Sequence, residues 1–132
     1  MRAFFSAYGA MLAQAVCVHI AYVLVSVAAG FVLGMVLGVL LSRAPRWSAV
    51  LLPVVSVFQT VPGLVFIGVL FLWLGMRPVT VLAALSIYAA FPVLKNTVAG
   101  LAAVEPQYKE AARGCGMDQL QRLRLVELPL AM

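Results

Sequence analysis

The sequence has few charged side chains, and the acidic ones are the rarest. Charged residues make up 10% of the 132 positions, with 9 Lys and Arg against 4 Asp and Glu, whereas soluble domains carry about 25%. No charge occurs between Arg2 and Arg43, or between Arg46 and Arg77. A membrane helix needs about 20 apolar residues, and a charge at its centre costs about 2.5–3.5 kcal/mol. The scarcity excludes a soluble globular domain and predicts an all-α, polytopic membrane bundle with about three spans, with membrane lipid around it.

Residues that bind metals or act as nucleophiles are also scarce. His19 is the single histidine, and Cys17 and Cys115 lie almost a chain length apart, so neither a disulfide nor a metal site is predicted. Nucleophile–base sets, paired carboxylates and phosphate-binding Gly-Lys-Ser/Thr patterns are absent from the sequence. We therefore predict no catalytic residue, no cofactor and no metal. The net charge of +5 is explained by basic residues at the cytoplasmic ends of spans, without a nucleic acid partner.

The first predicted span covers residues 20–41. An N-terminal Arg, an apolar stretch and an Ala-Gln-Ala triplet before it resemble a signal peptide, but hydrophobic sequence resumes at once, which favours an amphipathic lead-in. His19 then reads as an interfacial polar residue at the helix entry, rather than as a transport residue. The span carries small residues at every fourth position, namely Ser26, Gly30, Gly34, Gly38 and Ser42. Although glycine is common in membrane helices generally, this single register favours a face for close helix packing.

Prolines interrupt the next apolar region, between Trp47 and Met76. We predict a short helix over 49–58 and a span over 63–74, followed by a third span over 79–98. Gln59 and Thr60 lie at the break between the first two of these. Broken helices at membrane depth are tolerated where they line a cavity or are buried in protein, so these two residues are candidates for a translocation path, or else for the water interface. Lys95 is expected to reach the interface through its long side chain.

The basic residues indicate the orientation of the spans. With three spans, Arg2 and Arg77 fall on one side and the remaining seven basic residues on the other. The larger group comprises Arg43, Arg46, Lys95, Lys109, Arg113, Arg122 and Arg124. Because basic loops stay in the cytoplasm, the N-terminus is predicted to lie outside.

The C-terminal segment, residues 105–129, contains all four acidic residues. Glu105-Pro106 is typical of a helix start, Gly114 and Gly116 end that helix, and Asp118 with Gln121 forms a capping-box pattern for a second one. Leu120, Leu123 and Val126 are spaced as an apolar helical stripe, which Pro129 is expected to end. Such a helix–glycine–helix elbow suits a groove on another protein, although a helix pair on the membrane surface fits the same pattern.

One spacing in this segment resembles the EAA signature of ABC importer permeases. The matching positions are Glu110, Ala111, Ala112, Gly116, Val126, Leu128 and Pro129, with Val126 in place of the usual isoleucine. In that family the signature forms cytoplasmic coupling helices that seat in an ATPase subunit. The resemblance therefore implies a permease subunit in a bacterial inner membrane that is not itself an enzyme. Its implied partners are an ABC ATPase, an extracytoplasmic substrate-binding protein and a second permease subunit.

Other parts of the chain narrow the resemblance to osmoprotectant permeases. These are His19 with Ser26, the run Gln59-Thr60-Val61-Pro62, and Pro92 to Thr97 with Gly100, where Lys95 replaces a usual arginine. The implied cargo is glycine betaine, choline or carnitine; an amino acid, methionine or sulfonate permease is the alternative. Family members continue past Leu128-Pro129 with about two further helices. We therefore expect residues 1–132 to be an incomplete permease domain, or else a remnant that does not transport.

Overall fold

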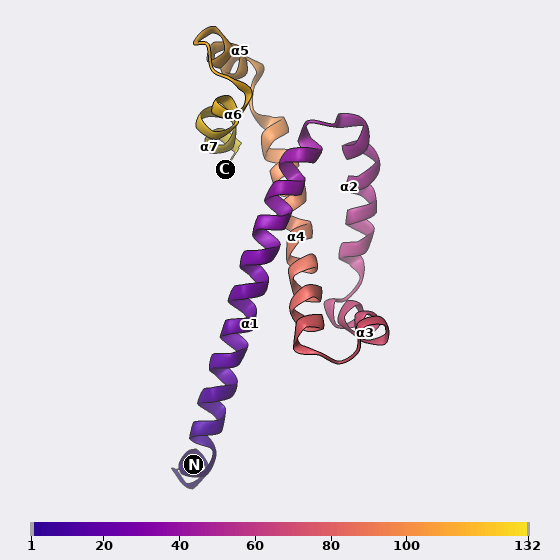
Figure 1. The fold of residues 1–132 in the computed structure, drawn as a ribbon, viewed down its shortest axis with the longest axis vertical. Coiled ribbons are helices and arrows are strands. Elements are labelled where there is room, and N and C mark those ends of the chain that lie inside the picture. The colour runs from indigo at the N-terminus through magenta and orange to yellow at the C-terminus, as the bar shows by residue number, and fades with distance from the viewer. Residues whose placement is uncertain (1, 132) are drawn as a thin grey trace.

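The computed structural model describes the backbone of residues 2–131 and the side chains of residues 8–131. This part of the chain is helical and contains no strand, which confirms the predicted all-α class. Figure 1 shows long helical rods with a small helical cluster at one end. In chain order the elements are α1 (Arg2–Ser42), α2 (Pro45–Thr60), α3 (Gly63–Leu74), α4 (Pro78–Ala103), α5 (Pro106–Gly114), α6 (Gln119–Arg122), the π-helix η1 (Leu123–Glu127) and α7 (Leu128–Ala131).

Helices α1 and α4 form the centre of the structure and run in the same direction (Figure 1). The small residues of α1 face α4: a Cβ added to Gly30 would lie 2.6 Å from the carbonyl oxygen of Ser86. The same added atom on Gly34 would lie 2.6 Å from the carbonyl oxygen of Ala90, and on Gly38 it would lie 2.6 Å from Cβ of Thr97. The backbones therefore meet directly, as small residues allow in membrane helix pairs.

Prolines set where several helices begin. Pro45, Pro78 and Pro106 occupy the first turns of α2, α4 and α5, respectively. A backbone N–H at this position has no acceptor within the helix, so proline costs no hydrogen bond there, and its fixed φ suits the helix. Pro53 and Pro92 instead lie inside α2 and α4. Membrane helices tolerate interior prolines because neighbouring groups satisfy the freed carbonyls.

Helices α2 and α3 meet at a sharp bend of 97°. Helix α3 occupies residues 63–74, but its 12 residues are only about 18 Å long, well short of the roughly 30 Å hydrocarbon core. Helix α2 is longer than the predicted 49–58, and it is α2 that runs beside α4 while α3 turns across the rods (Figure 1). Helix α3 has the predicted bounds, and α2 and α3 reach the length of a span as a bent pair.

By length and composition, two helices could cross a membrane, or three if the bent pair counts as one span. The first candidate is Tyr8–Ser42 and the second is Pro78–Ala103. Both are longer than the predicted spans 20–41 and 79–98, because α1 includes the residues before Ile20 and α4 continues past Val98 to Ala103. The described part of the chain is thus an all-α membrane bundle of two or three spans.

Candidate functional site: the C-terminal helix cluster and the α2–α3 break

The C-terminal cluster of α5, α6, η1 and α7 lies at the end of the rods where α1 and α4 finish (Figure 1). It contains three of the four acidic residues, with Glu105 directly before α5, and the residues of the EAA-like spacing. Its polar composition and its place beyond the ends of the spans make it the part of the chain suited to contact a water-soluble partner.

The first helix of the cluster ends in a glycine turn. Gly116 has φ +76°, a left-handed conformation that residues with a Cβ adopt only at a cost. Its N–H donates to the carbonyl of Arg113 at 2.9 Å, and the N–H of Met117 donates to the carbonyl of Ala112 at 3.1 Å. This pair of bonds is the Schellman motif, which satisfies the last carbonyls of a helix. The glycine of the EAA-like spacing therefore turns the chain out of α5.

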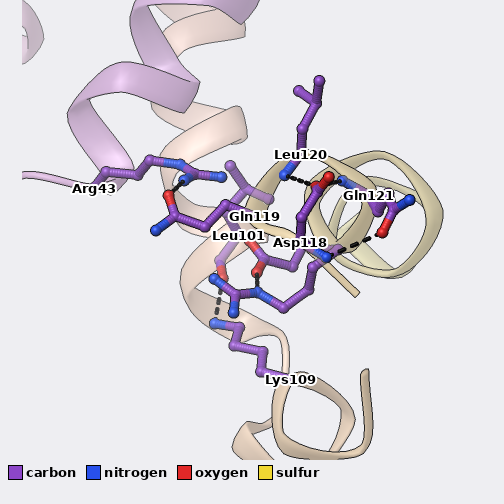
Figure 2. Close-up of polar contacts among 9 residues, drawn as sticks. Arg43, Leu101, Lys109, Asp118, Gln119, Leu120 and Gln121 are labelled. Atoms are coloured by element: carbon purple, nitrogen blue, oxygen red, sulfur yellow. Dashed lines mark hydrogen bonds and ion pairs between the residues drawn. The ribbon is translucent and has the colours of Figure 1, made fainter. Parts of the chain in front are cut away.

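The second helix is started by the predicted capping box. The Asp118 carboxylate accepts from the N–H groups of Leu120 and Gln121, at 2.8 and 2.7 Å, and the Gln121 side chain accepts from the Asp118 N–H at 3.0 Å. Both ends of the link between α5 and α6 are thus closed by local hydrogen bonds. Figure 2 shows the capping residues beside the end of α1.

The helix then widens into a π-turn over Leu123–Glu127. In an α-helix, residues five positions apart point in different directions, whereas a π-helix closes its bonds from i to i+5. The wider turn brings Arg122 and Glu127 together, with Nε 2.6 Å from Oε1 and side chains that are 14% and 12% exposed. No role was predicted for Glu127 from the sequence. The signal that could have found it was an acid within an otherwise apolar stripe.

The π-turn also alters two predictions for this helix. Leu123 is buried, but Leu120 is 55% exposed, so Leu120, Leu123 and Val126 do not form one continuous stripe. Pro129 was expected to end the helix, and that is wrong, because α7 continues to Ala131. Leu128 donates its N–H to Leu123, five residues back. The widened turn displaces the preceding carbonyls that the proline ring would otherwise meet.

The residues of the EAA-like spacing differ in exposure. Ala112 is buried, and Val126 and Leu128 are half-buried. Glu110, Ala111, Gly116 and Pro129 are exposed. Ala112, Val126 and Leu128 therefore pack within the cluster, while the exposed members lie at its surface.

Polar contacts join the cluster to the spans. The Arg43 guanidinium donates to the Gln119 side-chain oxygen at 3.1 Å, and the Lys109 ammonium donates to the Leu101 carbonyl at 3.2 Å, as Figure 2 shows. Between them lies a cavity of about 330 Å³ whose lining includes Arg43, Lys109 and the Arg122–Glu127 pair. Gly100 approaches Ala131 so closely that an added Cβ would lie 2.5 Å from the Ala131 carbonyl oxygen. The cluster is thus held against the ends of α1 and α4.

The α2–α3 break is the second polar location. Gln59 is half-buried, and its side-chain oxygen accepts from the Lys95 ammonium at 3.3 Å. The expectation that Lys95 extends to the interface therefore gives way to a contact between α4 and the end of α2. Thr60 is exposed, and its hydroxyl donates to the Val57 carbonyl in its own helix. The break thus brings Gln59, but not Thr60, to a charged side chain.

Aromatic rings line α4 and its neighbours at the same break. Phe66, Tyr88, Phe91 and Phe58 form a row in which each ring centroid lies 6.3 Å from the next. The Tyr88 hydroxyl donates to the Val61 carbonyl at 3.3 Å, which satisfies a backbone group in the break. We refer to Phe58, Gln59, Phe66, Tyr88, Phe91 and Lys95 together as the break site.

Comparison with known proteins identifies the family. Residues 30–132 match the model of the binding-protein-dependent transport system inner membrane component. The chain belongs to this family. The match includes the glycine face of α1, the break site and the whole C-terminal cluster. The matched residues include every position of the EAA-like spacing.

Curated relatives include osmoprotectant permeases. The chain is 39% identical over 101 residues to the glycine betaine/carnitine/choline transport system permease protein OpuCD of Bacillus subtilis, covering 76% of this chain and 44% of the relative. It is 34% identical over 113 residues to the choline transport system permease protein OpuBB of the same organism, covering 86% and 52%. It is 34% identical over 115 residues to the osmoprotectant import permease protein OsmY of Salmonella typhimurium, covering 86% and 49%. The chain thus spans about half the length of the curated relatives it matches. No solved structure matches it.

Proposed function

We infer that this chain is a transmembrane permease subunit of an ATP-driven importer for osmoprotectants of the glycine betaine, choline and carnitine type. The family supports the permease role, and the names of the relatives support the cargo. ATP is hydrolysed by a separate subunit, and a binding protein delivers the cargo from outside. A second permease subunit completes the pathway. The chain itself performs no covalent chemistry.

The observation that carries the proposal is the elbow between α5 and α6. The Schellman turn at Gly116 and the capping box at Asp118 fix the angle between two short helices by local bonds. A rigid, exposed elbow at the end of the spans can bind in a groove on the ATPase. Hydrogen bonds of Arg43 and Lys109 attach the elbow to α1 and α4, so a movement of the elbow can be transmitted to these helices. Glu110 lies on its exposed surface.

The same placement supports the predicted orientation. The elbow, Arg43 and Arg46 share one end of the rods, and Arg77 lies at the other end, before α4. An elbow that meets a cytoplasmic ATPase puts the N-terminus of α1 outside the inner membrane. Lys95 does not belong to the cytoplasmic group, because it lies within α4. The charge asymmetry on which the orientation rests still favours this assignment without Lys95.

The test is capture of the ATPase by variants of the elbow. Gly116→Val forces a β-branched residue into a left-handed conformation and is expected to misdirect α6 and abolish capture. Gly114→Ala is the matched control, because this glycine ends α5 without a positive φ and an added Cβ meets open space. Glu110→Lys should weaken capture less severely, by reversing one exposed charge. If Gly116→Val and Glu110→Lys retain the ATPase as tightly as the parent chain, the elbow is not the docking element.

A further inference from the structure

Lys95 is a cation inside a candidate membrane span without an acidic partner. The four acidic residues of the chain all lie at 105–127, beyond the end of α4. Within the described residues the ammonium donates to a neutral amide oxygen, that of Gln59, at 3.3 Å. Ionisable residues within spans usually face the bundle interior or a pathway and pair with an opposite charge. The half-buried Lys95 therefore lacks the anion that would complete its environment.

The direction of the side chain places this cation at the break. Side chains in a helix lean toward its N-terminus, so Lys95 on α4 leans back along Phe91 and Tyr88. These residues lie one and two turns earlier on the same face of the helix, about 6 Å and 10 Å along its axis. Gln59 follows Phe58, whose ring contacts Phe91. One positive group thus lies at the end of a row of four rings.

The faces of aromatic rings attract cations, including quaternary ammonium groups, which have no N–H to donate in a hydrogen bond. Cation–π contacts operate within about 6 Å of a ring centroid and are the common way in which proteins recognise quaternary ammonium groups. The rest of the described chain does not cover the ring row: Phe58 is 49% exposed, and Phe66, Tyr88 and Phe91 are half-buried. The row and Lys95 therefore offer two complementary subsites, one for a quaternary ammonium group and one for a carboxylate.

We propose that the break site binds small zwitterions that carry a carboxylate and a quaternary ammonium group. The carboxylate accepts from the Lys95 ammonium and from the Gln59 amide, and the ammonium group rests against the ring row. The inference rests on the proposed function and deepens it, because it names the residues that bind each end of the cargo. Lys95 then favours zwitterions such as glycine betaine over choline, which has the ammonium group and no carboxylate.

Binding of radiolabelled glycine betaine and choline to the full chain in lipid nanodiscs tests the proposal. Lys95→Met removes the charge and keeps an unbranched side chain. It should lower the affinity for glycine betaine about ten- to a hundredfold, the contribution of a charge-assisted hydrogen bond. The affinity for choline should stay unchanged or increase. Lys95→Arg keeps the charge and should retain glycine betaine binding. Arg77→Met is the control: it removes a cation at the start of α4, where the side chain makes no capping bond, and should change neither ligand.

Phe91→Leu probes the other subsite. Loss of one ring should lower the affinity for both ligands by a similar factor, since both carry the quaternary ammonium group. The proposal is overturned if the parent chain binds neither ligand, or if Lys95→Met weakens choline as much as glycine betaine. It is also overturned if glycine betaine is unaffected by Lys95→Met. ATPase capture by the elbow is measured separately on the same variants, so failure of the proposed function appears as lost capture by the parent chain, whatever the ligands do.

Discussion

Arg43, just beyond the end of α1, donates to the side-chain oxygen of Gln119, the first residue of α6, over 3.1 Å. The two residues are 76 positions apart in the chain. This bond and the Lys109 contact with Leu101 connect the elbow directly to the ends of the two central helices. A displacement of α6 therefore acts on α1 without passing through the intervening helices.

Arg43→Ala should loosen α6 without destabilising the bundle. The bond is exposed, so its net contribution is about 0.5–1 kcal/mol. Amide hydrogen exchange, read by mass spectrometry, should accelerate in residues 119–127 and stay unchanged in α1 and α4. Equal acceleration throughout the chain would instead mean that the bond supports the whole fold.

Arg122→Met should destabilise the cluster, because it leaves the largely buried Glu127 carboxylate without its partner. We expect a loss of about 2 kcal/mol, measured as faster hydrogen exchange over residues 119–131. Arg124→Met is the matched control, since Arg124 lies two positions away on the same turn and is exposed. Similar losses in both variants would show that the ion pair makes no specific contribution.

Gly34→Ala should separate α1 from α4. The added methyl group would lie 2.6 Å from the Ala90 carbonyl oxygen and 2.8 Å from Cβ of Val93, and overpacking of this kind costs about 1–3 kcal/mol. Gly68→Ala places the same group on α3, where it meets nothing within 4 Å. Thermal unfolding in detergent should show a lower Tm for Gly34→Ala and an unchanged or higher Tm for Gly68→Ala. The reverse order would contradict the packing described here.

Cys115 reports the orientation of the membrane helices. It is exposed at the end of α5, on the face expected to be cytoplasmic. In a Cys17→Ser background, a membrane-impermeant maleimide should label Cys115 in broken cells and not in intact spheroplasts. Labelling in intact spheroplasts would place the elbow outside and exclude contact with a cytoplasmic ATPase.

Local chemistry explains most of what the sequence could predict. Charge-free runs mark the helices because membrane insertion penalises charge, and the four-residue period of Gly30, Gly34 and Gly38 is visible without a partner. The Asp118 capping box needs residues only three positions apart. Such features depend on the helix itself, so a sequence pattern is sufficient to find them.

The remaining features depend on contacts between distant segments. The Lys95–Gln59 bond joins residues 36 positions apart, and no periodicity relates them. The π-turn at Leu123–Glu127 cannot be read from helix propensities, because residues that form it would also form an α-helix. Pro129 misled the prediction for this reason. The predicted helix 49–58 already contained Pro53, and the residues it missed lie at its two ends, where α2 begins at Pro45 and continues to Thr60.

Backbone contact between α1 and α4 has a mechanical consequence. Where Gly30 and Gly34 meet carbonyl oxygens of α4, the helices interlock, and sliding one past the other would drive the methyl groups of α4 into the α1 backbone. Such a pair resists shear, and it rotates or tilts as a single rigid lever. Flexibility is then expected where helical bonding is interrupted, and the bend between α2 and α3 is one such place. If the proposed function holds, we expect the pair to tilt about such a bend as a unit, with the elbow at the end that contacts the ATPase.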